Sequence, residues 1–340
     1  MKIKLVSFTK QGGKLCAKLQ EELNRQGHCA VGYCKYYSEG TKLLDYNIKE
    51  FTENSFDTCG AIVYIGAVGI AVRAIAPFLK SKTIDPAVLV IDETARYVIP
   101  VLSGHIGGAN DLAHTIASIL SAQPIITTAT DCNYRFAVDT WAVNNRLHIA
   151  NAESIKHISA AILNGEQVGL YSDFPIEGDL PEGLSLSSNT RVGICISLVN
   201  KQIFEHTLQL IPKQYVLGIG CRKNTKYEDL LNFVNMVLME YNISPHEVEA
   251  ITSIDLKAEE EALLLLCREL RVPFYTYSAQ ELSLVSGEFA ESSFVKATTG
   301  VGNVCERAAI KACNGKLLLR KTCSEGMTIA IAKKEWRCKF

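Results

Sequence analysis

An alternation of short apolar runs with helical patterns is the feature that most restricts how this chain folds. In the first third, strand patterns at 2–8, 61–65, 87–91, 97–102 and 124–127 alternate with amphipathic helical patterns at 14–26, 68–79 and 109–120. Parallel strands need crossover connections of about a dozen or more residues, and these are usually helices. The alternation therefore predicts a three-layer α/β/α lobe with a mostly parallel sheet.

The same rhythm returns near Tyr215 after an interruption. Helical patterns at 227–241, 258–270 and 304–313 alternate there with strand patterns at 215–219, 248–254, 272–277, 294–298, 316–320 and 328–332. Residues 131–213 instead combine one helical pattern with short strand patterns and a stretch rich in Gly, Pro, Ser and acidic residues. We therefore predict two three-layer α/β/α lobes with mostly parallel or mixed sheets, joined by a small middle α+β region, as domains 1–130, 131–213 and 214–340.

Charge and cysteine content exclude several classes of protein. The chain has 35 Lys and Arg against 36 Asp and Glu, so no excess of positive charge favours nucleic acid. Its 12 cysteines form no C-x-x-C pair and no Cys/His cluster with zinc spacing, so we expect reduced thiols, no metal site and a cytoplasmic location. The most apolar stretch, 61–79, contains Arg73, glycines and Pro77, which argues against a membrane span. The N-terminal residues lack the pattern of a signal peptide.

Glycine-rich corners between predicted strands and helices carry the candidate binding residues, because ligands of open α/β sheets bind at the carboxyl ends of strands. In the first corner, Gly66 and Gly69 allow a tight turn before a helix whose free N–H groups suit an anion. Arg73, about one turn further, is able to bind a carboxylate with two hydrogen bonds. An ordinary tight turn with an arginine paired to a surface acid fits these residues equally well.

The second corner provides the strongest candidate for catalysis. Its predicted site residues surround one histidine and are Ser103, Gly104, His105, Gly107, Gly108 and Asn110. An imidazole beside several backbone donors suits proton transfer next to a developing oxyanion. Asp92 and Glu93 follow the preceding predicted strand, so either carboxylate is a candidate to orient His105. The alternatives are a loop histidine bonded to a backbone carbonyl and a solvated acidic pair at a turn.

Three corners in the C-terminal third suit an anionic ligand. They contain Gly218, Gly220, Cys221 and Arg222, then Asp255 and Lys257, and finally Thr299, Gly300, Gly302 and Glu306. Neither glycine pair completes G-x-G-x-x-G, and the chain has no G-x-x-x-x-G-K-[ST], so a dinucleotide site or a P-loop is not expected. Glycine turns with nearby cations and helix N-termini still suit carboxylates or phosphates. The alternatives are a packing role for Cys221, an N-cap role for Asp255 and a surface position for Lys257.

The motifs at these corners resemble those of the cobalt-precorrin-5A hydrolases of anaerobic cobalamin biosynthesis. The resemblance covers nearly the whole chain and is carried by GAVGIAVRAIAP (66–77), DPAVLVID (85–92), SGHIGGAND (103–111), GIGCRK (218–223), SIDLK (253–257) and TGVGNVCERAA (299–309). It implies a hydrolase that opens the δ-lactone of a cobalt-bound, ring-contracted tetrapyrrole, releases acetaldehyde and forms cobalt-precorrin-5B. The resemblance implies that cobalt arrives with this substrate, so no separate cofactor is expected.

For the reaction that the resemblance implies, we offer a mechanism as a hypothesis. We expect His105 to act as general base on the attacking water, with N–H groups of Gly104, Gly107 and Gly108 binding the oxyanion. The substrate carries many carboxylates, which fit the cations and helix N-termini of the other corners. A homodimer and transient contacts with neighbouring enzymes of the pathway stay open.

Three other classes of protein stay open as well. The first is a non-catalytic tetrapyrrole carrier or scaffold of the same pathway. The second is a nucleotide-dependent enzyme, which the incomplete glycine patterns disfavour. The third is a methyltransferase of the pathway, although no sequence feature indicates a binding site for S-adenosylmethionine.

Overall fold

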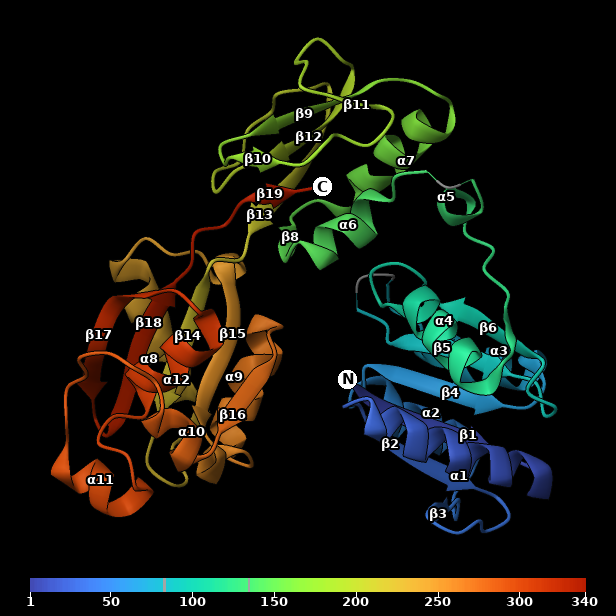
Figure 1. Cartoon of the computed structure of the whole chain (residues 1–340), viewed down its shortest axis with the longest axis horizontal. Helices are drawn as coiled ribbons and strands as arrows, with labels where there is room; N and C mark the ends of the chain where they lie inside the picture. Colours follow the sequence, from blue (N-terminus) through green and yellow to red (C-terminus); the bar gives the residue numbers. More distant parts are fainter. Residues whose placement is uncertain (82–83, 134) are drawn as a thin grey trace. The chain divides into compact units, whose positions relative to one another are not determined.

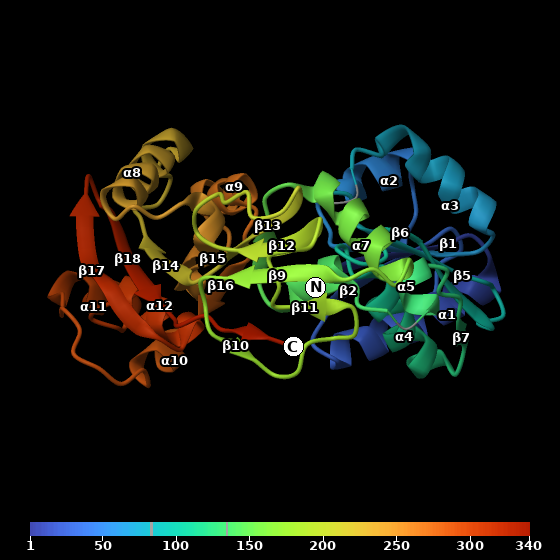
Figure 2. The ribbon, with the colours of Figure 1, turned by 90° about the horizontal axis from the view of Figure 1, so that it is seen from above.

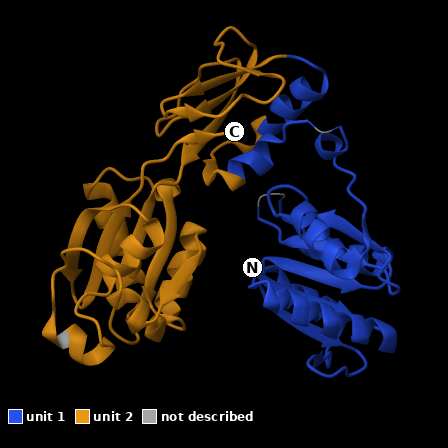
Figure 3. Ribbon diagram, in the orientation of Figure 1, with its two compact units in different colours: residues 1–143, 155–166 blue, residues 144–154, 167–340 orange. Residues whose placement is uncertain are grey.

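The computed structural model describes residues 1–81, 84–133 and 135–340, which form two compact units (Figure 3). The first unit contains residues 1–143 and 155–166, and the second contains residues 144–154 and 167–340. Within the described residues, no helix is both long enough and apolar enough to cross a membrane. The predicted boundaries after residues 130 and 213 stay a prediction.

A seven-stranded sheet forms the centre of the first unit (Figures 1 and 2), in the order β3-β2-β1-β4-β5-β6-β7. Its strands are β1 Lys2–Ser7, β2 Cys29–Cys34, β3 Lys42–Leu43, β4 Ala61–Ile65, β5 Ala87–Ile91, β6 Tyr97–Leu102 and β7 Gln123–Pro124. All neighbouring strands run parallel except β5 and β6, which are antiparallel. Every residue of β4 and β5 is buried, as expected for central strands that are covered on both faces.

Helices cover both faces of this sheet. The helices of this part of the chain are α1 Lys10–Arg25, α2 Ile48–Phe56, α3 Val68–Ile75, the 3-10 turn η1 Ala76–Phe78, α4 Ala109–Leu120, α5 Ala129–Cys132, α6 Val138–Asn144 and α7 Ile155–Leu163. One apolar cluster joins Leu5 and Leu89 to α1 and α4, and another joins Val6 and Val88 to α2 and α3. Because successive strand residues point to opposite faces, the sheet is the middle of three layers.

The antiparallel pairing of β5 with β6 decides where the loops around the sheet emerge. Val88 pairs with Leu102 and Ile91 pairs with Val98, so β6 ends beside the start of β5. The corner after β4 and the turn after β5 therefore lie at one edge of the sheet, because β4 and β5 are parallel. The loop that follows β6 emerges at the opposite edge.

The second unit contains two larger sheets and a small one. A middle sheet has the order β11-β9-β12-β13-β8, a C-terminal sheet has the order β16-β15-β14-β18-β17, and β10 pairs with β19. The strands are β8 Leu147–Ile149, β9 Val168–Ser172, β10 Ile176–Glu177, β11 Leu184–Ser185, β12 Val192–Ile196, β13 His206–Pro212, β14 Tyr215–Gly220, β15 Val248–Ile254, β16 Phe274–Tyr277, β17 Lys316–Ser324, β18 Met327–Lys333 and β19 Cys338–Lys339. Both larger sheets are mixed, since each pairs parallel and antiparallel strands.

The C-terminal sheet is also the middle of three layers. Helices α8 Tyr227–Glu240 and α9 Glu261–Leu270 pack on one face, and α12 Cys305–Cys313 packs on the other. The shorter elements are η2 Ala152–Ser154, η3 Pro245–Glu247, η4 Asp255–Lys257, α10 Ala279–Ser283 and α11 Ser293–Thr299. The predicted fold class, two α/β lobes with a middle α+β region, is confirmed.

One predicted strand is wrong, because residues 294–298 belong to helix α11. The Ser292 side chain accepts a hydrogen bond from the N–H of Val295 at the start of this helix, and Gly300 ends it with a left-handed φ of 79°. These two caps satisfy free backbone groups at the two ends of the helix. They therefore stabilise a helix in a stretch whose β-branched residues alone favour a strand. The strand predicted at 124–127 is also shorter in the structure, where β7 spans Gln123–Pro124.

Candidate active site

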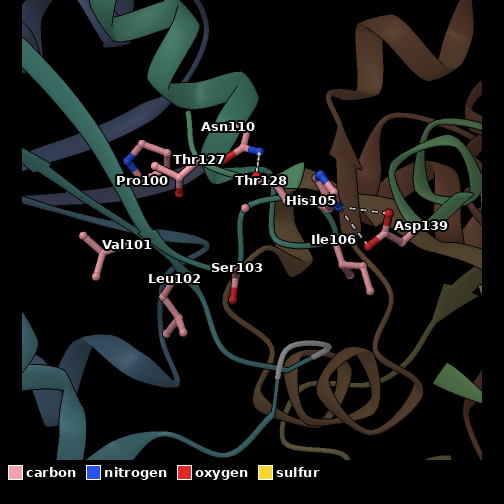
Figure 4. A pocket seen from close by; sticks show the side chains of 11 residues that line it. Pro100, Val101, Leu102, Ser103, His105, Ile106, Asn110, Thr127, Thr128 and Asp139 are labelled. Atoms are coloured by element: carbon pink, nitrogen blue, oxygen red, sulfur yellow. Dashed lines mark hydrogen bonds and ion pairs between the residues drawn. The ribbon is translucent and has the colours of Figure 1, made fainter. Parts of the chain in front are cut away.

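The loop after β6 lines a cavity of about 350 Å³ in the first unit (Figure 4). The lining residues are Pro100, Val101, Leu102, Ser103, Gly104, His105, Ile106, Asn110, Thr127, Thr128 and Asp139. Ser103 anchors the loop, since its Oγ donates to the carbonyl of Asp85 over 2.9 Å. A Cβ on Gly107 would lie 2.3 Å from the Cβ of Ser103, so only glycine fits this tight loop.

His105 is held between two carboxylates. Its Nδ1 lies 3.1 Å from Asp139, at the start of α6, and its Nε2 lies 2.9 Å from Asp131, in α5. Figure 4 shows the contact of His105 with Asp139. The His105 side chain is only 13% exposed, so both hydrogen bonds are partly shielded from water. Sequence reasoning predicted the histidine and missed both of its partners.

Asn110 connects Asp131 to the first turn of α4. Its Nδ2 donates to Asp131 over 2.7 Å and to Thr128 Oγ1 over 2.9 Å. Asp131 therefore accepts hydrogen bonds from both His105 and Asn110, which fixes its position while 37% of its side chain stays exposed. The site thus contains an anchored histidine and an accessible carboxylate within hydrogen-bond distance.

The two carboxylates set the charge of the imidazole. The hydrogen bond with Asp139 is the main reason why the pKa of His105 rises to about 9, although burial opposes the rise and Asp131 adds to it. Burial raises the pKa of Asp139, but the hydrogen bond and charge of His105 outweigh this and hold that pKa below its ordinary value. His105 is therefore an imidazolium at neutral pH. Both ring nitrogens contact carboxylates, so the structure shows no free lone pair on this ring, and the role of His105 as general base stays a prediction.

The backbone around His105 supports only part of the predicted oxyanion site. The N–H of Gly108 donates to the carbonyl of His105 over 2.9 Å, so it is not available to a substrate oxygen. Gly108 has a left-handed φ of 77° at the start of α4. Among the described residues, no partner is found for the N–H groups of Gly104 and Gly107, and of these two only Gly104 lines the cavity.

Asp92 and Glu93 do not orient His105, because they lie at the opposite edge of the sheet. The Asp92 carboxylate accepts the N–H groups of residues 94, 96 and 97 and stabilises the turn between β5 and β6. Glu93 accepts a hydrogen bond from Thr9 Oγ1 over 2.5 Å. The prediction that either acid positions the histidine is therefore wrong.

The first predicted corner lies at that same opposite edge. Gly66 has a φ of 154° and its N–H donates to the carbonyl of Ile91 over 2.8 Å. Gly69 and Arg73 are on helix α3, and the Arg73 guanidinium is exposed, 3.5 Å from the Gly69 carbonyl. None of these three predicted binding residues lines the cavity around His105.

The C-terminal lobe contains a larger cavity of about 610 Å³, within the second unit. The predicted binding residues that line it are Gly220, Cys221, Arg222, Lys257 and Thr299. Lys223 and Lys321 add further positive charge to the wall, and Lys257 is paired with Glu260 at 2.7 Å. Ile254 and Met327 contribute apolar surface. The combination suits a large anion with apolar faces.

Glu306 and Gly218 have structural roles instead of the predicted binding role. Glu306 is fully buried, and its carboxylate accepts the main-chain N–H of Lys321 over 2.7 Å and that of Ala290 over 3.4 Å. A Cβ on Gly218 would lie 1.9 Å from the Cys305 carbonyl oxygen, so this glycine allows α12 to pack closely on β14. Neither residue lines the cavity, so the structure supports a packing role for Gly218 and a hydrogen-bonding role for Glu306.

Asp255, Gly300 and Gly302 also lie outside the cavity wall. Asp255 accepts the N–H of Leu256 over 2.8 Å within the short η4 turn. Gly300 ends helix α11, and a Cβ on Gly302 would overlap the Glu291 carboxylate. These three residues therefore determine the backbone conformation next to the cavity, and they do not line it.

Comparisons with known proteins match three family models along the chain. Residues 50–131 match the cobalamin synthesis G N-terminal model, residues 136–212 match the cobalamin biosynthesis central region, and residues 215–332 match the cobalamin synthesis G C-terminus. A crystal structure of a cobalamin biosynthesis protein G homolog from Sulfolobus solfataricus covers 97% of this chain and 96% of its own, with 28% identity and a TM-score of 0.43.

Two similar proteins carry the name cobalt-precorrin-5A hydrolase. The chain is 36% identical to the one from Salmonella typhimurium over 310 residues, which is 87% of this chain and 88% of that protein. It is 29% identical to the one from Priestia megaterium over 355 residues, which is 96% of this chain and 94% of that protein. The matches define a protein of cobalamin biosynthesis. The chain belongs to the cobalamin synthesis G family, as its motifs predict.

Proposed function

We propose that this chain is a cobalt-precorrin-5A hydrolase, which opens the δ-lactone of that cobalt-bound tetrapyrrole and releases acetaldehyde to give cobalt-precorrin-5B. The observation that carries the proposal is the 36% identity over 88% of a protein with this name. The cavity that contains His105 supports it, because a cationic acid beside an accessible carboxylate suits ester hydrolysis. The cobalt belongs to the substrate.

The first step is hydrolysis of the lactone. Asp131 takes a proton from water, whose oxygen bonds to the lactone carbonyl carbon. Protonated Asp131 no longer holds the Nε2–H of His105 as a carboxylate does, so this N–H donates to the developing oxyanion, with the N–H of Gly104 as a second donor. The tetrahedral intermediate then breaks the ring C–O bond, and His105 donates its proton to the departing alkoxide. Asp139 keeps the imidazole oriented during this transfer.

The second step releases the two-carbon unit. The alcohol formed by ring opening loses its proton to the now neutral His105, a C=O bond forms, and the C–C bond to the macrocycle breaks. The electron pair of that bond enters the conjugated macrocycle, which takes up the proton that Asp131 removed from water, so Asp131 is again a carboxylate and His105 again an imidazolium. One water is consumed in the first step, and acetaldehyde leaves in the second.

The cavity of the C-terminal lobe is the proposed contact for the substrate's carboxylates. Arg222, Lys223 and Lys321 supply positive charge along a wall that also has apolar surface. Charge-assisted hydrogen bonds from such groups are stronger than neutral ones and suit a polycarboxylate. The cavity volume of about 610 Å³ accommodates part of a tetrapyrrole, so the rest of the ligand stays outside this cavity.

The test is anaerobic incubation of purified protein with cobalt-precorrin-5A, with trapping of volatile aldehyde and mass measurement of the corrinoid. Acetaldehyde and the matching mass loss support the proposal. His105→Ala should lower kcat by about a hundredfold or more, whereas His114→Ala, an exposed position on the same loop-to-helix segment, should not change it. A substrate that co-elutes unchanged with the protein refutes the hydrolase and supports the carrier.

A cytoplasmic location, a homodimer and transient contacts with neighbouring pathway enzymes belong to the proposal as well. The scattered spacing of the 12 cysteines, without a C-x-x-C pair, is the sequence observation behind the proposed location. Cell fractionation tests the location, and light scattering of the purified protein tests the dimer. Co-purification with other enzymes of the pathway tests the transient contacts.

A further inference from the structure

A third cavity, of about 410 Å³, lies in the second unit, where elements of the middle sheet meet the C-terminal lobe. Its wall comes from β8, the β13–β14 connection, α8, η3, β15 and the end of α9. The lining residues are His148, Lys213, Leu231, Asn235, Pro245, His246, Val248, Glu269, Leu270 and Arg271. None of them belongs to the catalytic cavity or to the proposed substrate contact.

Four basic side chains converge on this cavity. His148 and His246 stack with ring centroids 4.0 Å apart and ring planes 6° from parallel, and Lys213 and Arg271 complete the set. The four residues come from four separate segments of the chain, so the cluster is assembled by the tertiary fold. Glu269 is the acidic residue of the wall, and it is exposed.

Lys213 and Arg271 supply the positive charge of this cluster, because His148 is neutral at neutral pH. Burial lowers the pKa of His148 to about 4, and the charges of His246, Lys213 and Arg271 push it in the same direction. Burial also lowers the pKa of Lys213, although Glu249 opposes this effect. Glu249 is itself engaged by Arg146 and Lys334, which share its charge.

The geometry of the two histidines favours an anion over a metal ion. The lone pair of an imidazole nitrogen lies in the ring plane, and the planes of these two rings are nearly parallel. Their lone pairs therefore do not converge on one ion, as metal coordination would require. In contrast, an imidazole N–H, an ammonium and a guanidinium all donate to phosphate or carboxylate oxygens.

We propose that this cavity binds a small multivalent anion that carries phosphate or carboxylate groups. Lys213 and Arg271 make the charged contacts, and a ring N–H of His148 donates a hydrogen bond beside them. The volume of about 410 Å³ exceeds what one inorganic phosphate fills, and Leu231 and Leu270 supply apolar wall for an organic part. The bound anion contacts both the middle sheet and the C-terminal lobe.

The test uses the full-length protein and calorimetric titration at pH 6.5 with inorganic phosphate and, separately, citrate as probes. Saturable binding of either probe is expected, and the tighter probe identifies the chemistry of the ligand. Lys213→Met should weaken binding about tenfold or more. Arg268→Met removes the same charge from a neighbouring exposed position of α9 outside the cavity wall, so it should bind like the unchanged protein.

The imidazole resonances of His148 and His246 provide a second readout. Binding in this cavity should raise the pKa of His148 by about one unit or more, because the negative charge of the anion offsets the positive charge of the neighbouring side chains. Absence of saturable binding below about 10 mM overturns the proposal, and so does equal weakening by Lys213→Met and Arg268→Met. Both outcomes are independent of lactone hydrolysis, which uses the cavity around His105.

Discussion

Replacement of Asp139 by Asn tests the electrostatic argument for the active site. The hydrogen bond and charge of Asp139 are the main reasons why the pKa of His105 rises from 6.5 to about 9. Asparagine keeps the size of the side chain and removes the charge. The pKa of His105 should therefore fall in Asp139→Asn, and it should fall less in Asp131→Asn, whose contribution is smaller.

The raised pKa also has a consequence for stability. The rise of the His105 pKa from 6.5 to about 9 contributes on the order of 3 kcal/mol to the free energy of unfolding, because one pKa unit is worth about 1.4 kcal/mol. A pKa raised in the folded state stabilises the fold fully below pH 6.5, and this contribution is lost as the pH rises through 9. Asp139→Asn should remove most of this pH dependence.

Two measurements check this prediction. The imidazole resonances of His105 report its pKa directly, and denaturant unfolding at several pH values reports stability. Trp141 lies on α6 beside Asp139, and the chain has one other tryptophan, Trp336, in the second unit. A Trp336→Phe background therefore makes fluorescence report on the first unit. Titration of His105 near pH 6.5 in the unchanged protein, or equal shifts in the two Asp variants, would refute the reasoning.

The remaining predictions concern packing and substrate binding in the C-terminal lobe. Gly69, on helix α3 of the first unit, provides a matched glycine control for the packing prediction. Gly218→Ala should lower the free energy of unfolding by about 2 kcal/mol or more, measured with denaturant, because the new Cβ would overlap a carbonyl of α12. Gly69→Ala, within a helix and 3.5 Å from the flexible Arg73 tip, should stabilise by up to about 1 kcal/mol, and equal effects of the two changes contradict the packing argument. Arg222→Met and Lys321→Met should each raise KM several-fold with kcat unchanged, and a loss of kcat alone would remove these residues from substrate binding.

The direction of β6 shows what the strand pattern leaves undetermined. The sequence predicts β4, β5, β6 and α4 with the bounds that the structure has. An apolar run does not indicate whether its strand runs parallel or antiparallel to its neighbour. Residues 92–96 are nevertheless too few for a parallel crossover, so the length of this connection already indicates an antiparallel pair. The prediction that Asp92 lies beside His105 did not take the short β5–β6 connection into account.

The partners of His105 could not be found from local sequence. Glycines around a single histidine identify the loop, because such a cluster is costly in chain entropy and signals a special backbone. Asp131 and Asp139 lie 26 and 34 residues further along, and neither stands in a motif that links it to the loop. They reach the histidine only when α5 and α6 fold back onto the end of β6. Tertiary structure, and not spacing, assembles the acid pair.

Because the two edges of the sheet in the first unit are far apart along the strands, the protein can be immobilised through one edge without modifying the other. Arg73 is exposed at the edge opposite the histidine loop, and it lines none of the cavities described above. A clickable unnatural amino acid at this position would tether the protein to a sensor surface through that edge. This attachment leaves the histidine loop, at the other edge of the sheet, unmodified, so substrate and anion binding can be followed without a cysteine label among 12 native thiols.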